Sequence, residues 1–352
     1  MERAFPLRGL YGWYSRRTPW IRRLLCTLLG FLAAGSILWF VPTATYITAP
    51  GAAVDTSRMV AVQGGVTRPG RLHMLIVTSQ PANLFWYLYA KLDPRADLET
   101  PEEFLGEIED YDKYIELTRR MMAESQLVAK AVALHEAGYG KGARSEGVEI
   151  TDLATASPST GYLVPGDIIL ELQGRPVASV AELRDVLLRA PAGRPVAVRI
   201  RRAKQEMSVM VPTGEHTDPE RKGTAALGIF IKDYLTFDVP IPVRIKSGAI
   251  TGPSAGLMFT LQIIDQLTPG GLTGNMVIAG TGTIEYDGRV GPIGGVRQKV
   301  FAAEVAGARA IFVPRENYPA AAAAATRIEV VPVGHVREAL QWIEAHKAEG
   351  GA

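Results

Sequence analysis

The stretch "ITGPSAGLMFTLQIIDQL", Ile250 to Leu267, sets one serine between two glycines and a proline, directly before a long apolar run. The apolar residues predict a buried helix in the second half of this stretch. Ser254 then has two interpretations. It caps the helix by accepting a hydrogen bond from a nearby backbone N–H, worth about 1 kcal/mol, or it is a nucleophile.

The residues around Ser254 favour a nucleophile. Gly252 and Gly256 keep bulk away, so another backbone can approach closely, and Pro253 stiffens the approach to the serine. The N–H groups of a first helical turn attract negative charge, which is what the oxyanion of an acyl-transfer reaction needs. We therefore expect the backbone of Gly252 and Ala255 to form the turn and the oxyanion site.

A serine nucleophile also needs a base. The letters from Gly252 to Gly256 fit the G-x-S-x-G elbow, but a proline stands where the strand should enter. A Ser-His-Asp triad is poorly supported, although distance in sequence does not exclude it. No histidine lies in a glycine-rich turn or beside a motif-like carboxylate; the five are His73, His135, His216, His335 and His346.

Lysine is the other available base. The segment "GRVGPIGGVRQKVFAAEVAGA", Gly288 to Ala308, puts Lys299 in a predicted helix among apolar neighbours. Burial there would lower its pKa and let it accept a proton near neutral pH. The alternative is a surface lysine that lays its stem on the protein and keeps its charge in water.

The N-terminus carries a membrane signal. Residues 1–23 hold six arginines and one glutamate, whereas residues 24–41 carry no charge. Eighteen apolar residues at about 1.5 Å each nearly span a hydrocarbon core of about 30 Å. The positive-inside rule then keeps the N-terminus in the cytoplasm and the body outside. A cleaved signal peptide is the rival interpretation, but its apolar core is usually shorter, roughly 7–15 residues.

The rest of the chain gives few functional signals of other classes. It has 32 basic and 35 acidic residues beyond position 23, which gives no electrostatic reason to expect nucleic acid. The single cysteine, Cys26, allows no intrachain disulfide. "YITAPG", Tyr46 to Gly51, predicts a turn out of the membrane, and residues 71–79 predict a strand. The aromatic segment 83–92 is interpreted as a helix packed on its own domain rather than as a membrane contact.

Residues 101–138 predict helix, and short strands follow. "GYLVPGDIILELQGRPV", Gly161 to Val177, a capped helix from Ser179 and a hairpin resemble a PDZ domain of the kind attached to bacterial proteases. Such a domain holds a peptide by strand addition. No Gly-Leu-Gly-Phe-like carboxylate loop precedes Gly147. Thr213 to Thr224 reads as a linker.

Four ordered motifs carry a second resemblance. "GPSAG", "IAGTGTI" (Ile278 to Ile284), "GPIGGVRQK" and "GARAIFVPREN" resemble the proteolytic domain of Lon-type Ser-Lys proteases. The resemblance implies Ser254 as the nucleophile, Lys299 as the general base and Thr281 as a hydroxyl that supports the lysine. Relative to ATP-dependent Lon, Thr251 and Thr283 replace acidic residues, so a carboxylate contribution to the site is in doubt.

With the anchor, the whole chain resembles the membrane-anchored PDZ–Lon-like proteases of bacteria. No GxxxxGK[ST] is present, so the phosphate cradle of a P-loop is missing from the sequence. We expect no cofactor and no metal, peptide or unfolded protein segments as substrates, and a hexameric ring by family analogy. An inert PDZ-bearing membrane scaffold is the alternative.

The expected fold is a multidomain α/β and α+β chain. Its expected parts are a basic cytoplasmic segment (1–23), a transmembrane helix (24–42), an extracytoplasmic helical region (43–145), a PDZ-like β-rich domain (146–213) and a Lon-type α/β proteolytic domain (224–352).

Overall fold

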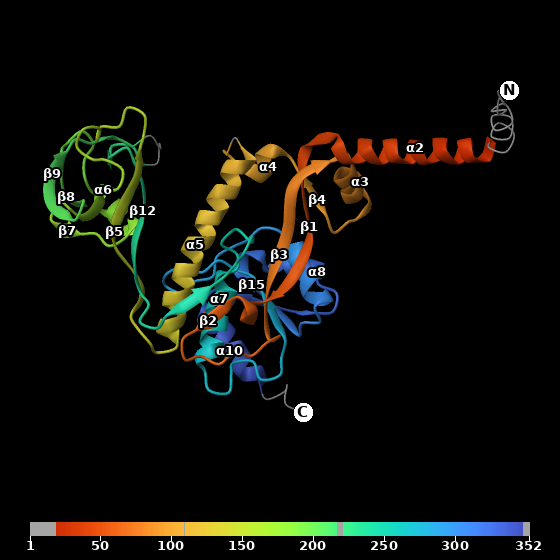
Figure 1. Ribbon diagram of the computed structural model, residues 1–352. Coiled ribbons are helices and arrows are strands. Elements are labelled where there is room, and N and C mark those ends of the chain that lie inside the picture. Colours follow the sequence, from red (N-terminus) through yellow and green to blue (C-terminus); the bar gives the residue numbers. More distant parts are fainter. Residues whose placement is uncertain (1–18, 109, 217–220, 348–352) are drawn as a thin grey trace, which may run out of the picture.

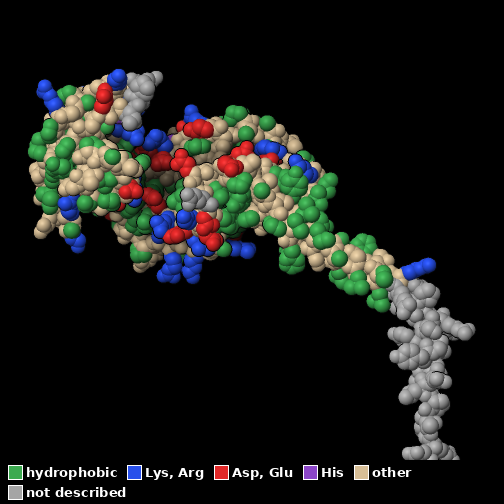
Figure 2. Space-filling view, turned by 90° about the horizontal axis from the view of Figure 1, so that it is seen from above, with side chains coloured by type: hydrophobic (Ala, Val, Ile, Leu, Met, Phe, Trp, Pro, Cys, Tyr) green, Lys and Arg blue, Asp and Glu red, His purple; other side chains and the backbone are tan. Residues whose placement is uncertain are grey.

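A computed structural model describes residues 19–108, 110–216 and 221–347 of the chain. One long helix, α2 (Pro19–Phe40), projects from a body of two folded units (Figure 1). Its 18 residues from Arg23 to Phe40 are long and apolar enough to cross a membrane, and none of them is buried. Hydrophobic side chains line the projecting helix in Figure 2. The expected apolar helix is therefore present, whereas residues 1–18 of the basic segment lie outside the described residues.

A six-stranded sheet forms the centre of the larger unit, here called the α/β unit. Its strand order is β16-β15-β14-β3-β1-β4. The pairs β16–β15, β15–β14 and β14–β3 are parallel, and β1 runs antiparallel to both β3 and β4. The strands are β1 (Pro42–Asp55), β3 (Leu72–Asn83), β4 (Asp97–Glu99), β14 (Ile278–Gly280), β15 (Ala310–Pro314) and β16 (Glu329–Val333).

This sheet corrects the expected division of the chain. Residues 43–145 were expected to form a region separate from a 224–352 domain, but β3 pairs with β14 from Leu72 opposite Ile278 to Met74 opposite Gly280. The physical reason is that β14 needs a partner on each side to bury its backbone polar groups. The α/β unit is therefore built from two segments far apart in sequence.

Helices cover both faces of the sheet, because side chains alternate across a strand. On β3, Leu72 and Met74 point into one apolar cluster, whereas the following residue, Leu75, points into the other. The first cluster includes residues of α5 (Tyr111–Glu136), α7 (Gly256–Leu267) and α10 (Val336–His346); the second includes residues of α8 (Val296–Val305) and α9 (Tyr318–Ala324).

The smaller unit, the PDZ-like unit, is a contiguous insertion between α5 and the remaining α/β unit (Figure 1). Its sheet has the order β12-β5-β6-β8-β9, with β7 paired to β6. An aliphatic core fills it, from Val148 to Leu227. The elements are β5 (Gly142–Leu153), β6 (Ile168–Leu172), β7 (Arg175–Pro176), α6 (Val180–Leu187), β8 (Val196–Arg202), β9 (Gln205–Val211) and β12 (Ile229–Asp238).

The expected boundaries at 213 and 224 also differ from the structure. β12 pairs with β5 from Ile229 opposite Leu153 to Asp238 opposite Gly142, so the PDZ-like unit extends to about residue 238. The expected linker contains strand residues instead, because β10 (Gly214–Glu215) pairs with β11 (Ala225–Ala226). Residues 217–220 within it lie outside the described residues.

Smaller elements complete the chain. The expected turn at Tyr46 to Gly51 is wrong, since these residues lie inside β1, which accommodates them with a register shift between Pro50 and Ala53. In place of one expected helix at 101–138, the structure has two, α4 (Pro101–Leu105) and α5. The remaining elements are η1 (Thr56–Arg58), β2 (Val60–Val62), α3 (Leu84–Leu92), β13 (Val243–Ile245) paired with β2, and η3 (Arg315–Asn317).

Candidate active site

The serine of the opening stretch does not cap the following helix. Helix α7 begins at Gly256, and Ala255 occupies its cap position without a side-chain hydrogen bond. Across the described parts of the chain, the Ser254 hydroxyl takes part in no hydrogen bond, and the residue is partly exposed. The capping interpretation is therefore wrong, and the hydroxyl remains available to another group.

The turn that presents Ser254 is held from two sides. Gly252 has φ +85°, a left-handed conformation that favours glycine, so it makes the expected turn. Its N–H donates to the carbonyl of Thr118 on α5 (2.9 Å) and so already has an acceptor. A Cβ on Gly256 would come within 2.7 Å of the Ser125 hydroxyl oxygen and within 3.0 Å of the Ile284 nitrogen. The expected close approach of another backbone at Gly256 is confirmed.

The amides of the turn are not all used. Gly256 donates to the carbonyl of Pro253 (3.1 Å), and Leu257 donates to that of Gly282 (3.1 Å). Within the described residues, the N–H groups of Ser254 and Ala255 have no acceptor. Two adjacent unpaired donors beside a free hydroxyl are suited to hold a developing negative charge.

Lys299 is buried rather than exposed. Only 2% of its surface is accessible, which rules out the surface-lysine interpretation. Burial alone lowers its pKa from 10.5 to about 7, and no neighbouring carboxylate contributes to the shift. Its Nζ donates to the Thr281 hydroxyl oxygen at 3.0 Å. Near neutral pH the amine is therefore neutral in a large fraction of molecules and can accept a proton.

Thr281 joins the two candidate residues. Its hydroxyl accepts from Lys299 and donates to the Ser254 carbonyl oxygen at 3.1 Å. That same carbonyl accepts from the N–H of Gly282 at 2.8 Å. A hydroxyl has one proton to donate, so these two bonds fix its direction. The structure thus connects Lys299 and Ser254 through Thr281.

The sheet explains why residues so far apart in sequence meet. Thr281 directly follows the carboxyl end of β14, where open α/β sheets place their sites. Ser254 precedes α7 on one face of the sheet, and Lys299 lies on α8 on the other. Ser254 and Lys299, one from each helical layer, therefore meet at the carboxyl end of β14.

The histidines are used elsewhere. His135 contacts the carbonyl of Gly140, and His346 that of Trp342. His335 caps α10 and contacts the carbonyl of Asp287. Burial lowers the pKa of His73, which lies on β3 opposite Asp55. Within the described residues, none of these contacts joins a histidine to Ser254.

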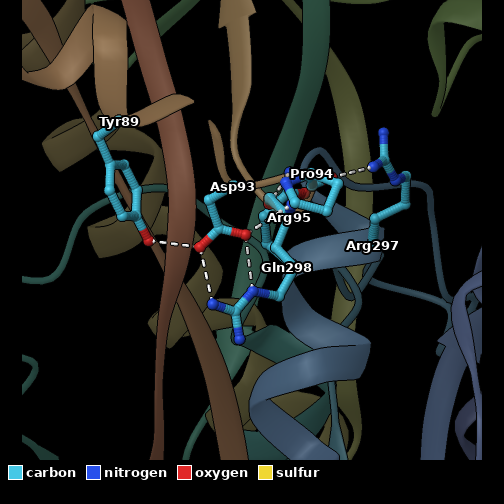
Figure 3. A network of polar contacts seen from close by, with 6 residues as sticks. All are labelled: Tyr89, Asp93, Pro94, Arg95, Arg297 and Gln298. Carbon is cyan, nitrogen blue, oxygen red and sulfur yellow. Dashed lines mark hydrogen bonds and ion pairs between the residues drawn. The ribbon is translucent and has the colours of Figure 1, made fainter. Parts of the chain in front are cut away.

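Sequence reasoning missed the residues that hold α8 in place (Figure 3). Gln298 is 1% exposed, and its side-chain amide donates to the carbonyl of Arg95 (3.0 Å). The same amide donates to Asp97 (2.7 Å). Arg297 donates to the carbonyl of Pro94 and to Asp97. The Arg95 guanidinium is itself fixed by Asp93, which Tyr89 also contacts. No motif signals these contacts, because they join segments about 200 residues apart.

Within the described residues, no group of three or more His, Cys, Asp or Glu side chains is placed to hold a metal ion. The sequence shows no nucleotide-binding loop either. The groups that the structure places at the site are the hydroxyls of Ser254 and Thr281, the amine of Lys299 and the backbone amides of Ser254 and Ala255.

Two family models match the chain. The Lon protease (S16) C-terminal proteolytic domain matches residues 221–348, and the PDZ domain matches residues 123–213. The first match begins before β12, which the structure assigns to the PDZ-like sheet. Neither match includes β1 and β3, the strands that complete the central sheet.

Curated relatives agree with the first match. A Lon protease of Metamycoplasma arthritidis is 40% identical over 89 residues, covering 25% of this chain and 10% of the relative. Lon protease 2 of Thermus thermophilus is 36% identical over 131 residues (32% and 16%), and a Lon protease of Rickettsia bellii is 32% identical over 127 residues (34% and 16%). The chain thus spans at most 16% of the length of these three relatives.

One solved structure, the PDZ domain of an SdrC-like protein from Listeria monocytogenes, is 22% identical and covers 24% of this chain and 87% of its own, with a TM-score of 0.22. That likeness is too weak to add to the family match. By the family matches, residues 221–348 are similar to the C-terminal proteolytic domain of Lon proteases (S16), and residues 123–213 are similar to PDZ domains.

Proposed function

We propose that this protein is an ATP-independent, membrane-anchored serine endopeptidase that uses Ser254 as nucleophile and Lys299 as general base. The observation that carries the proposal is a buried lysine with no counter-ion among the described residues. Its pKa is lowered to about 7, and it is linked through Thr281 to the backbone carbonyl of Ser254. A protonated lysine could not take the proton of Ser254, whereas a neutral one can.

The reaction proceeds in two halves. Lys299 takes the hydroxyl proton of Ser254, and the oxygen attacks a peptide carbonyl while the amides of Ser254 and Ala255 hold the oxyanion. Lys299 then returns the proton to the departing amine, which leaves an acyl-enzyme. Lys299 next takes a proton from water, whose oxygen attacks the ester carbonyl. The bond to Ser254 then breaks, and Lys299 returns the proton to the serine oxygen as the carboxylic acid leaves.

The anchor supports a place at the membrane. Residues 23–40 form an exposed apolar helix, and five of the six N-terminal arginines precede it. By the positive-inside rule the body lies outside the cytoplasm. ATP is scarce there, which agrees with the missing P-loop motif. Without an unfolding motor, the substrates are peptides, flexible loops or unfolded segments, and a ring of six copies stays a prediction from the resemblance.

The test uses the full chain in nanodiscs with an unfolded fluorogenic protein as substrate. Ser254→Ala and Lys299→Ala should each lower cleavage by at least about a thousandfold. Lys130→Ala is the matched control, because burial also lowers the pKa of Lys130, yet it lies on α5 outside the site. Cleavage at the wild-type level in either site variant would reject the assignment. Failure of a fluorophosphonate probe to label wild type would favour the inert scaffold.

A second activity is supported by the PDZ-like unit, namely peptide binding. A pocket of about 780 Å³ lies between α6 and β12, which is an edge strand of its sheet. At its end, the N–H groups of Leu227 and Gly228 donate no hydrogen bond within the described residues. The segment "ALGI", Ala226 to Ile229, is the loop that we propose binds the terminal carboxylate of a peptide. Leu187→Asp should abolish binding of a fluorescent peptide with a free C-terminus, and amidation of that peptide should weaken it.

A further inference from the structure

Helix α3 has two apolar faces, and only one of them is covered. Trp86, Tyr89 and Ala90 pack on a small cluster beside β1. On the opposite face, Phe85 is 41% exposed, Leu88 44% and Leu92 85%. Residues three and four apart lie on the same side of a helix, so these three form one strip. Lys91 is the only charged residue of this helix.

The uncovered strip, Phe85, Leu88 and Leu92, continues the surface of the anchor helix. The rings of Phe85 and Trp39 lie 6.0 Å apart. Asn83 donates its side-chain amide to the carbonyl of Trp39 at 2.9 Å. Phe40, the last residue of α2, is 77% exposed. Figure 1 shows α3 beside the body end of α2, and Figure 2 shows hydrophobic side chains gathered at this junction.

No flexible linker separates the anchor helix α2 from the body. Helix α2 ends at Phe40 and β1 begins at Pro42, so a single residue separates them. Helix α2 has 22 residues and is about 33 Å long, which matches a hydrocarbon core of about 30 Å. If α2 crosses the membrane, its end at Phe40 therefore lies near the lipid headgroups, and so does the surface that adjoins it.

We propose that the uncovered strip of α3 docks into the interfacial layer of the bilayer that α2 crosses. A lipid surface is the occupant because the strip adjoins the lipid-facing end of α2 with no linker between. Lys91, next to the strip residue Leu92, can place its amine among headgroups. The expected packing of segment 83–92 on its own domain is confirmed for Trp86, Tyr89 and Ala90, and the proposal adds a lipid contact for the uncovered strip. It rests on the membrane anchoring proposed above.

Depth-dependent fluorescence quenching tests this in the full chain. Cys26, the only cysteine, is replaced by serine, and single bimane-labelled cysteines are placed at Leu88 or Leu92. Leu28 on α2 is the positive control and Val305, 66% exposed on α8, the negative one. In nanodiscs with brominated acyl chains, labels at positions 88 and 92 should lose at least half of their fluorescence, as the label at 28 does, while that at 305 stays unchanged.

The outcomes separate the two proposals. If the labels at 88 and 92 behave like the label at 305 while that at 28 is quenched, α3 does not contact lipid although the anchor spans the membrane. If the label at 28 is also unquenched, the anchoring itself is wrong. As a second test, Phe85→Ser with Leu88→Ser should at least halve the quenching of the label at 92. Val305→Ser should leave it unchanged, and equal thermal transitions exclude unfolding as the cause. Unchanged quenching in the double variant would overturn the docking.

Discussion

Each unit of the body contains a buried ionisable side chain, but among the described residues only the one in the PDZ-like unit has a partner of opposite charge. In the PDZ-like unit, the fully buried Asp167 accepts two hydrogen bonds of 2.6 Å from Arg202 and one from the N–H of Val164. In the α/β unit, the equally buried Lys299 has a threonine hydroxyl and no carboxylate. Arg202 offsets part of the desolvation cost of Asp167. Lys299 has no such partner and a shifted pKa, which is common among groups at functional sites.

The largest effect should come from removing the unpaired amine. Lys299→Met should lower peptide cleavage by at least about a thousandfold and raise the free energy of unfolding at pH 7 by about 1–4 kcal/mol, because an apolar side chain has no charge to desolvate. Cleavage assays and chemical denaturation measure the two changes. Loss of both activity and stability would mean that Lys299 is a structural residue.

The stability change should depend on pH with a definite sign. The pKa of Lys299 is 10.5 before folding and about 7 after it, so the unfolded chain binds more protons between these values. Wild-type stability should therefore gain from this group as pH rises from about 7 to about 10.5. The Lys299→Met variant should lack that gain, so the difference between the two proteins should shrink across this range.

A smaller effect is expected from pH on activity. If neutral Lys299 is the base, kcat/KM should fall about fiftyfold between pH 7 and pH 5, as the neutral fraction falls below a pKa of about 7. The profile is measured with a short fluorogenic peptide, and circular dichroism at each pH checks that the protein stays folded. A flat profile from pH 5 to pH 9 would contradict a lysine base.

Thr281 should matter less than the residues that it joins. Thr281→Val removes the acceptor for Lys299 and the donor to the Ser254 carbonyl, and we expect about a tenfold loss in kcat with KM within twofold. The pH midpoint should move downward, because the ammonium form loses a hydrogen-bond partner. Thr281→Ser keeps the hydroxyl and should restore both properties. A Thr281→Val variant with wild-type kcat and pH midpoint would remove Thr281 from the site.

The smallest effect on cleavage should come from removing Arg202, the partner of the buried Asp167. Arg202→Leu leaves Asp167 buried without its partner and should destabilise the PDZ-like unit by about 1–3 kcal/mol, discounted because Arg202 is partly exposed. Hydrogen exchange should report faster exchange in β6 and β8. Cleavage of a short peptide should stay within twofold. A tenfold loss would show that the two units are coupled more closely than their separate cores suggest.

Much of the site could be predicted, because its chemistry lies in short local motifs. Gly252 to Gly256 and the segment around Lys299 are each continuous, and the buried state of the lysine follows from its apolar neighbours. The contacts of Gln298 with Arg95 and Asp97 could not be predicted, since nothing in either segment marks the other. The same limit applies to the sheet, where β14 pairs with β3 across roughly 200 residues.

Two predictions, the turn at residues 46–51 and the order of the domains, were wrong because strands pair with segments far away in the sequence. Proline and glycine at positions 50 and 51 indicate a turn, yet strand β1 keeps them by shifting register against β3. The sequence order also suggested successive domains, because an insertion leaves no local mark where it interrupts the host fold. The pairing of β12 with β5, which moves the boundary to about residue 238, is visible only in three dimensions.

The pairing of Gly142 with Asp238 has a practical consequence. Directly paired residues of neighbouring strands lie about 5 Å apart, so the PDZ-like unit leaves and re-enters its host at nearly one point. A two-residue turn could replace everything between them and yield a shortened enzyme in which cleavage is studied without peptide capture. A fragment cut at residue 221 would instead lose β1 and β3 and leave β14 as a bare edge.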